Sequence, residues 1–179
     1  MSETEHKHQN IPSVYIACLS SYNNGILHGS WINLKENSSV DELEEAINEI
    51  MALSPIAGAE EWAIHDYTGF YGYPLRESAS LQTIVELSQN ILKHGEPYAL
   101  LCKYQGRIVE IIDFEDAYVG SYESEESFGE EQMELLEVKV IPESYTNYFD
   151  VEEFARGLLI SDYHHENGTD GSLYVFRYL

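Results

Sequence analysis

The residues most able to do chemistry in this sequence are carboxylates, gathered in one window. Between residues 110 and 137 there are eleven Asp or Glu side chains and no Lys or Arg. B-DNA carries about one negative charge per 1.7 Å of its axis, so ordered carboxylates can imitate the field that a DNA-binding protein recognises. The other interpretation is an acidic face kept solvated for solubility. Residue types alone leave both interpretations open.

The spacing of these acids favours an ordered helix. Ser124 is a candidate N-cap for a helix that runs to about residue 137. Its apolar residues fall on one broad face, and they are Phe128, Met133, Leu135 and Leu136. A row of acids falls on the opposite face, at spacings of four, four and three residues, and consists of Glu126, Glu130, Glu134 and Glu137. We expect this row to extend for about 16 Å, with neighbours roughly 5 to 6 Å apart.

Two short histidine clusters, His164-His165-Glu166 and His65-Asp66, are candidate metal ligands. Adjacent residues on a strand point to opposite faces, so the members of each cluster do not easily share one ion. The acids after Asp150 lack the alternating spacing of a calcium loop, and they fit a helix N-terminus instead. We expect packed or solvated side chains and no metal.

Candidate nucleophiles are two cysteines in apolar contexts, Cys18 and Cys102. We expect buried free thiols rather than a disulfide, because nothing else in the sequence suggests export. We expect neither to be a nucleophile, because a thiolate needs an electropositive pocket that so acidic a chain does not favour. The sequence contains no phosphate-binding loop, no G-x-G-x-x-G and no Ser-centred motif. It therefore predicts no enzymatic activity and no cofactor.

The composition agrees with a folded protein that avoids nucleic acid and membranes. There are 32 Asp or Glu against 9 Lys or Arg, a formal net charge of −23, yet 44% of residues are hydrophobic and 14 are Tyr. Such a chain is too apolar for an acidic disordered tail, and it lacks the basic patch of a nucleic-acid binder. No apolar run approaches the roughly 18 residues of a membrane span, and the N-terminus lacks the apolar core of a signal peptide. We expect a cytoplasmic location.

The N-terminal part reads as a small α+β unit over residues 13–76, after a flexible tail at 1–12. Strands are expected at 13–19 and 26–34, joined by a turn at 22–25. Ser39 and Glu42 form a capping-box pattern that opens a helix, which ends at Ser54-Pro55. A third strand is expected at 60–67, paired with the first two.

The remaining chain divides into a mainly helical central domain (77–116) and a C-terminal α+β domain (117–179) that carries the acidic helix. Ser80 caps an expected helix through Lys93. Residues 98–114 fit a hairpin by local propensity and fit a pair of short helices by length. Asp150 opens a helix to about Leu159, followed by strands near 160–164 and 172–178. The predicted fold is α+β, built from small domains.

Four ordered blocks resemble the ArdA family of antirestriction proteins. These are residues 14–31 (Val-Tyr-Ile-Ala-Cys-Leu-Ser-Ser-Tyr-Asn-Asn-Gly … Gly-Ser-Trp), 61–67, 114–128, and 147–156 with 174–177. The third block is similar to the family's antirestriction motif. The resemblance implies an elongated chain of small domains. It also implies a homodimeric DNA mimic encoded on a mobile element such as a plasmid or conjugative transposon. It implies binding to the specificity and methylase subunits of type I restriction–modification enzymes.

The resemblance also implies which acids matter. The expected partner-binding carboxylates, which include the helical row, are Asp113, Glu115, Asp116, Glu123, Glu125, Glu126, Glu130, Glu131, Glu134 and Glu137. Tyr118, Gly120 and Tyr122 of the motif are expected to be structural. The alternative function is an acidic adaptor that sequesters a different basic DNA-binding host protein. A hydrolase or metal enzyme is a third hypothesis, which would require a cleft with clustered His and carboxylates.

Overall fold

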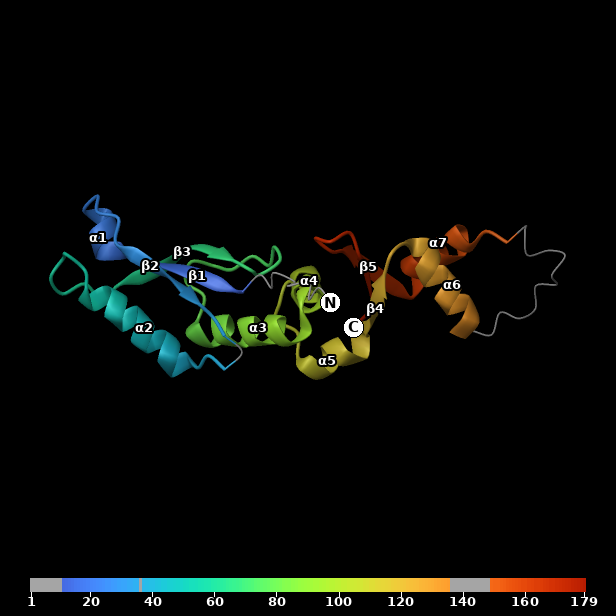
Figure 1. Cartoon of the computed structure of the whole chain (residues 1–179), viewed down its shortest axis with the longest axis horizontal. Coiled ribbons are helices and arrows are strands. Elements are labelled where there is room, and N and C mark those ends of the chain that lie inside the picture. Colours follow the sequence, from blue (N-terminus) through green and yellow to red (C-terminus); the bar gives the residue numbers. More distant parts are fainter. Residues whose placement is uncertain (1–10, 36, 136–148) are drawn as a thin grey trace, which may run out of the picture. The chain divides into compact units, whose positions relative to one another are not determined.

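The computed structural model describes residues 11–35, 37–135 and 149–179. Most of the predicted tail (residues 1–10), Leu136 and Glu137 lie outside the described residues. The chain divides into two compact units, Met1–Ile108 and Val109–Leu179. Each unit contains helices and a three-stranded antiparallel sheet, which confirms the α+β class (Figure 1). The predicted three-part division, with boundaries at 76 and 116, stays a prediction.

The first unit is built on a sheet with the strand order β2-β1-β3. Its elements, in chain order, are β1 (Ser13–Cys18), α1 (Leu19–Asn23), β2 (Gly29–Asn33), α2 (Val40–Ala52), β3 (Trp62–Thr68), α3 (Leu81–His94) and α4 (Glu96–Gln105). The central strand β1 is buried, as expected of a strand covered on both sides. Because β1 lies between the other two strands, β3 pairs with β1 alone, and the expected pairing of β3 with the second strand is wrong. The second strand starts at Gly29 rather than residue 26, because the short helix α1 and its loop come first.

Side-chain caps fix the first two long helices where the sequence predicts them. The Ser39 hydroxyl accepts a hydrogen bond from the Glu42 amide at 3.1 Å, and the Glu42 carboxylate accepts one from the Ser39 amide at 2.9 Å. The Ser80 hydroxyl caps α3 in the same way by accepting from the Thr83 amide. α2 packs against β1, β2 and α3 through buried apolar residues such as Leu43 and Ile47. The predicted capping box is confirmed.

The hairpin interpretation of residues 98–114 is wrong, and the alternative pair of short helices is confirmed. α4 occupies Glu96–Gln105, and α5 occupies Ile111–Ala117. A run of buried apolar residues, Tyr98–Cys102, is consistent with a strand and with a fully buried helix, so periodicity does not separate the two. The helix is signalled by Pro97 at its first turn and by Gly106 in the left-handed conformation at its end.

The second unit has a sheet with the order β4-β6-β5. Its elements are α5 (Ile111–Ala117), β4 (Tyr118–Tyr122), α6 (Glu125–Leu135), α7 (Val151–Ser161), β5 (Tyr163–Asn167) and β6 (Leu173–Arg177). The core joins α6, α7 and the sheet through Tyr122, Phe128, Ala155, Leu159, Leu173 and Val175. Asp150 caps α7 by accepting from the Glu153 amide at 2.9 Å, as predicted. The strand expected near 160–164 begins only at Tyr163, because α7 continues to Ser161.

The buried side of α6 differs from the predicted apolar face. Phe128, Gly129 and Gln132 are buried, whereas Leu135 is 66% exposed. The stripe facing α7 and β4 is therefore narrow, and the Tyr163 hydroxyl donates to Gln132 Oε1 at 3.5 Å within it. Among the described helices, none is long and apolar enough to cross a bilayer.

Candidate partner-binding surface

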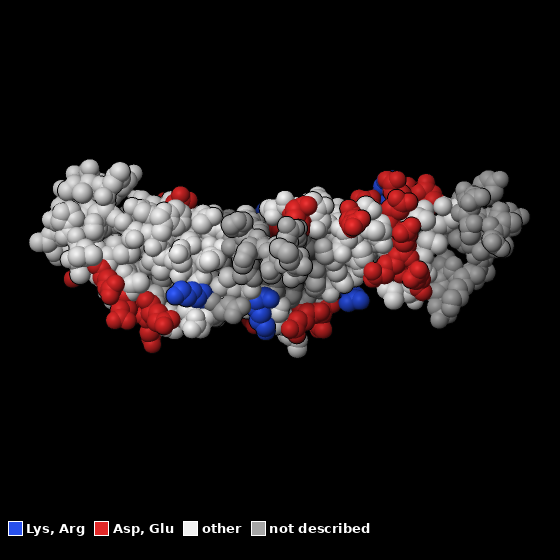
Figure 2. Space-filling view, in the orientation of Figure 1, with Lys and Arg blue, Asp and Glu red and all other residues white. Residues whose placement is uncertain are grey.

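Three carboxylates form an exposed row along α6. Glu126, Glu130 and Glu134 are each exposed, at steps of four residues, so the row repeats about every 6 Å and spans about 12 Å. No Lys or Arg of the described chain is ion-paired with any of the three. Figure 2 shows acidic side chains gathered over this part of the second unit. The row is held in place from behind by Phe128, which is fully buried.

The start of α6 is fixed by reciprocal hydrogen bonds between two serines. The Ser124 hydroxyl accepts from the Ser127 amide at 3.1 Å, and the Ser127 hydroxyl accepts from the Ser124 amide at 3.1 Å. This arrangement is a capping box in which serine replaces the usual Glu or Gln. Ser124 therefore starts the acidic helix where the sequence predicts.

Glu131 lies next to the row but is engaged by the sheet. The Tyr122 hydroxyl, on β4, donates to Glu131 Oε1 at 3.1 Å. Burial of the Tyr122 ring and this hydrogen bond to a carboxylate raise the pKa of Tyr122 to about 12. The phenol therefore stays protonated and keeps donating to Glu131, which fixes the orientation of that carboxylate.

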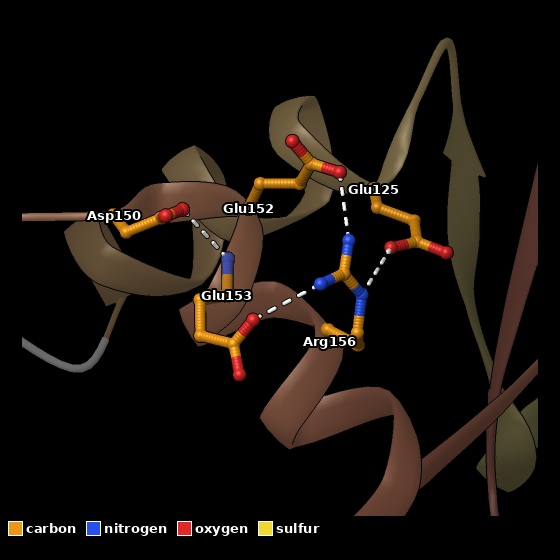
Figure 3. Close-up of polar contacts among 5 residues, drawn as sticks. All are labelled: Glu125, Asp150, Glu152, Glu153 and Arg156. Atoms are coloured by element: carbon orange, nitrogen blue, oxygen red, sulfur yellow. Dashed lines mark hydrogen bonds and ion pairs between the residues drawn. The ribbon is translucent and has the colours of Figure 1, made fainter.

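Glu125 is partly neutralised by a cation from another helix. Arg156 on α7 brings its Nε to 3.9 Å from Glu125 Oε2, and it also contacts Glu152 at 2.7 Å and Glu153 at 3.0 Å (Figure 3). The window 110–137 contains no Lys or Arg, but the fold brings Arg156 to Glu125 from 31 residues further along the chain. Sequence reasoning missed this contact, and no local signal pointed to it.

Three other predicted carboxylates, Asp113, Glu115 and Asp116, lie on α5, at the opposite end of β4 from α6. Glu115 and Asp116 are exposed and Asp113 is half-buried, whereas Glu123, between β4 and α6, is exposed. A five-residue strand separates α5 from α6 along the chain, which corresponds to about 17 Å. Arg177 donates from Nη1 to the Asp116 carbonyl at 3.1 Å, so a cation lies at this end. The nine predicted acids that the structure describes therefore do not form a single row.

A second acidic helix face lies in the first unit. Asp41, Glu45 and Glu49 follow one another at four-residue steps on α2, and with Glu44 they line a shallow depression. All four are exposed, because the opposite side of α2 is buried against the sheet. Figure 2 shows this second acidic gathering along α2. The same spacing rule that identifies the α6 row would have identified it, although the sequence analysis did not assign these acids to a partner.

Of the candidate metal and nucleophile residues, His164 and the two cysteines are buried, whereas His65 and Asp66 are exposed. Across the described part of the chain, no three His, Cys, Asp or Glu are arranged to hold a metal ion. His164 stacks on Phe176 with ring centroids 5.0 Å apart, and burial lowers its pKa to about 4. Cys18 and Cys102 are buried free thiols, and Cys18 Sγ lies 3.4 Å from the Ser54 hydroxyl. These groups support the cores of the two units.

Comparison with known proteins adds one positive match. The family model described as antirestriction protein (ArdA) matches residues 14–170 of the 179-residue chain. No curated protein matches the chain. The matched range includes α2, α5, α6 and α7, and thus all the described acidic faces.

Proposed function

Because the chain belongs to the ArdA family of antirestriction proteins, we propose that it acts as a decoy for DNA in the DNA-binding groove of type I restriction–modification enzymes. In this proposal it contacts the specificity and methylase subunits as a homodimer in the cytoplasm. Occupying the groove that both reactions share would inhibit modification as well as restriction. The antirestriction role itself follows from the family.

The observation that carries the proposal is the exposed row on α6. One DNA strand carries one phosphate per about 3.4 Å of the helix axis, whereas the row carries one carboxylate per about 6 Å of the α6 axis. The row alone thus has a little more than half the linear charge density of a strand. Two further exposed acids raise that density, Glu123 three residues before the row and Glu131 directly after Glu130. An ordered scaffold of this kind fits a groove built to bind phosphates.

Competition with DNA at varied salt tests the proposal directly. The protein should displace a labelled duplex carrying the recognition site from a purified methylase–specificity complex. Raising NaCl from about 50 to about 300 mM should weaken its binding at least tenfold, because carboxylates that replace phosphates meet the same basic side chains. An affinity unchanged by salt would contradict electrostatic mimicry.

Matched triple variants test which acidic face makes the contact. E126Q/E130Q/E134Q and D41N/E45Q/E49Q each remove three negative charges, one set from α6 and the other from α2. The α6 variant should lose more inhibition than the α2 variant, whereas single changes should matter little because the field is distributed. An equal loss of inhibition in the two variants would show that net charge, rather than the α6 row, determines binding. Abolition of inhibition by one single change, with the dimer intact, would indicate a localised hot spot.

A pull-down from cell extract separates this proposal from the acidic adaptor. Recovery of restriction–modification subunits supports the decoy. Recovery of a histone-like or single-strand-binding protein instead, with no inhibition of restriction in the purified assay, would favour the adaptor.

A further inference from the structure

α6 is attached to the second unit by few apolar contacts. Only Phe128, Gly129 and Gln132 of this 11-residue helix are buried, and one of these three is polar while another has no side chain. Phe128 reaches the core, but Leu135 at the far end is 66% exposed. Apolar burial therefore fixes the middle of the helix much better than its ends.

Electrostatic repulsion acts against this attachment. α6 carries five glutamates, and the first turn of α7 together with its cap adds Asp150, Glu152 and Glu153. Within the described spans of α6 and α7, Arg156 is the only Lys or Arg. The two helices meet closely at Gly129 and Ala155, so their acidic ends are brought near one another.

Arg156 is placed to offset that repulsion. Its guanidinium uses a different nitrogen for each carboxylate, with Nε toward Glu125 on α6, Nη2 toward Glu152 and Nη1 toward Glu153. Figure 3 shows the three carboxylates arranged around the guanidinium plane. A planar fork with several fixed donors can serve three partners at once, which a single ammonium group does less well.

We infer that Arg156 is a positioning residue that holds α6 against α7, so that Glu126, Glu130 and Glu134 keep a fixed place for the partner. The inference rests on the proposed function, since it names what orients the proposed contact surface. It also assigns Glu125 a different role from its neighbours, because Glu125 is paired with Arg156 of the same chain rather than left free for the partner. A cation thus supports binding to a basic partner, although it lowers the net negative charge.

Removing Arg156 makes the chain more negative but also removes the contact that positions α6, and these two effects change the affinity for a basic partner in opposite directions. R156Q and R76Q each remove one positive charge, and Arg76 is an exposed residue of the first unit. If net charge alone set the affinity, both variants would bind the methylase–specificity complex as tightly as the unaltered protein, or more tightly. Positioning predicts that R156Q binds about three- to tenfold more weakly while R76Q does not weaken. R156K, which keeps the charge without the fork, should recover only part of the loss.

Hydrogen exchange on the protein alone supplies a readout that does not depend on the enzyme. In R156Q, α6 amides should exchange at least threefold faster, with α3 amides unchanged. Unchanged α6 protection, or equal binding by R156Q and R76Q, would overturn the inference. Failure of the proposed function would be a separate result, because the unaltered protein would then not displace DNA from the complex. Hydrogen exchange would still show whether Arg156 holds α6 against α7.

Discussion

Gly129 is the position at which the packing of the acidic helix can be tested most sharply. A Cβ built there would lie 2.9 Å from Ala155 Cβ, 3.0 Å from the Val151 carbonyl oxygen and 3.1 Å from Val151 Cγ1. Carbon atoms in van der Waals contact are about 3.5 to 4.0 Å apart. Two of the three obstacles, a backbone oxygen and a Cβ, cannot rotate away. G129A must therefore move α6 away from α7 by several tenths of an ångström or more.

The expected cost follows from two opposing effects. Overpacking a tight contact costs about 1 to 3 kcal/mol, whereas replacing a helical Gly by Ala contributes up to about 1 kcal/mol through propensity. We expect G129A to lower the free energy of unfolding by about 1 to 2 kcal/mol. Gly157 is the matched control, since it is exposed on α7 and a Cβ there would meet nothing within 4 Å. G157A should raise stability by about 0.5 to 1 kcal/mol, the propensity gain alone.

Urea unfolding followed by circular dichroism measures both effects. G129A should shift the midpoint down and G157A should shift it up. The displaced α6 should also make G129A a weaker competitor of DNA, whereas G157A should compete as well as the unaltered protein. A G129A protein as stable as G157A would refute the close contact of α6 with α7 and the positioning argument built on it.

Two further predictions concern stability. Burial, followed by the charge of His165, lowers the pKa of His164 to about 4 from 6.5, so the unfolded chain takes up its proton first as pH falls. The free energy of unfolding should fall progressively from about pH 6.5 towards pH 4, by about 2 kcal/mol at pH 5. In urea titrations at pH 7.5 and pH 5, the H164F variant should lack this part of the loss. An identical pH dependence of the two proteins would contradict the prediction. S39A removes the hydroxyl that caps α2 and should cost about 1 kcal/mol in tryptophan-detected unfolding, because both tryptophans lie in the first unit; an unchanged midpoint would show that the cap contributes nothing.

Much of the local structure could be predicted because it is encoded within a few residues. Ser39 with Glu42, Ser80 and Asp150 each start a helix as predicted, since a cap is a contact between residues three apart. The sequence also predicts the strand at 13–18, because a short apolar run bounded by polar residues is typical of a central strand.

The error at residues 98–114 has a physical cause. Tyr98 to Cys102 are all buried, so α4 shows no polar side from which a helical period could be read. Local propensity then favoured strands, whereas the decisive signals were Pro97 and Gly106 at the two ends. Tertiary burial of every residue from 98 to 102 outweighed their local propensity for strands.

The sequence by itself determined that the chain is acidic, that an acidic helix begins after Ser124, and that Glu126, Glu130 and Glu134 share one side of it. These follow from charge counts and a period of 3.6 residues, which are local properties. Only the tertiary structure decided that Glu125 faces Arg156 and Glu131 faces Tyr122. Such pairs join residues on different elements, and the neighbour of a side chain across a helix–helix or helix–sheet contact is set by packing rather than by spacing along the chain.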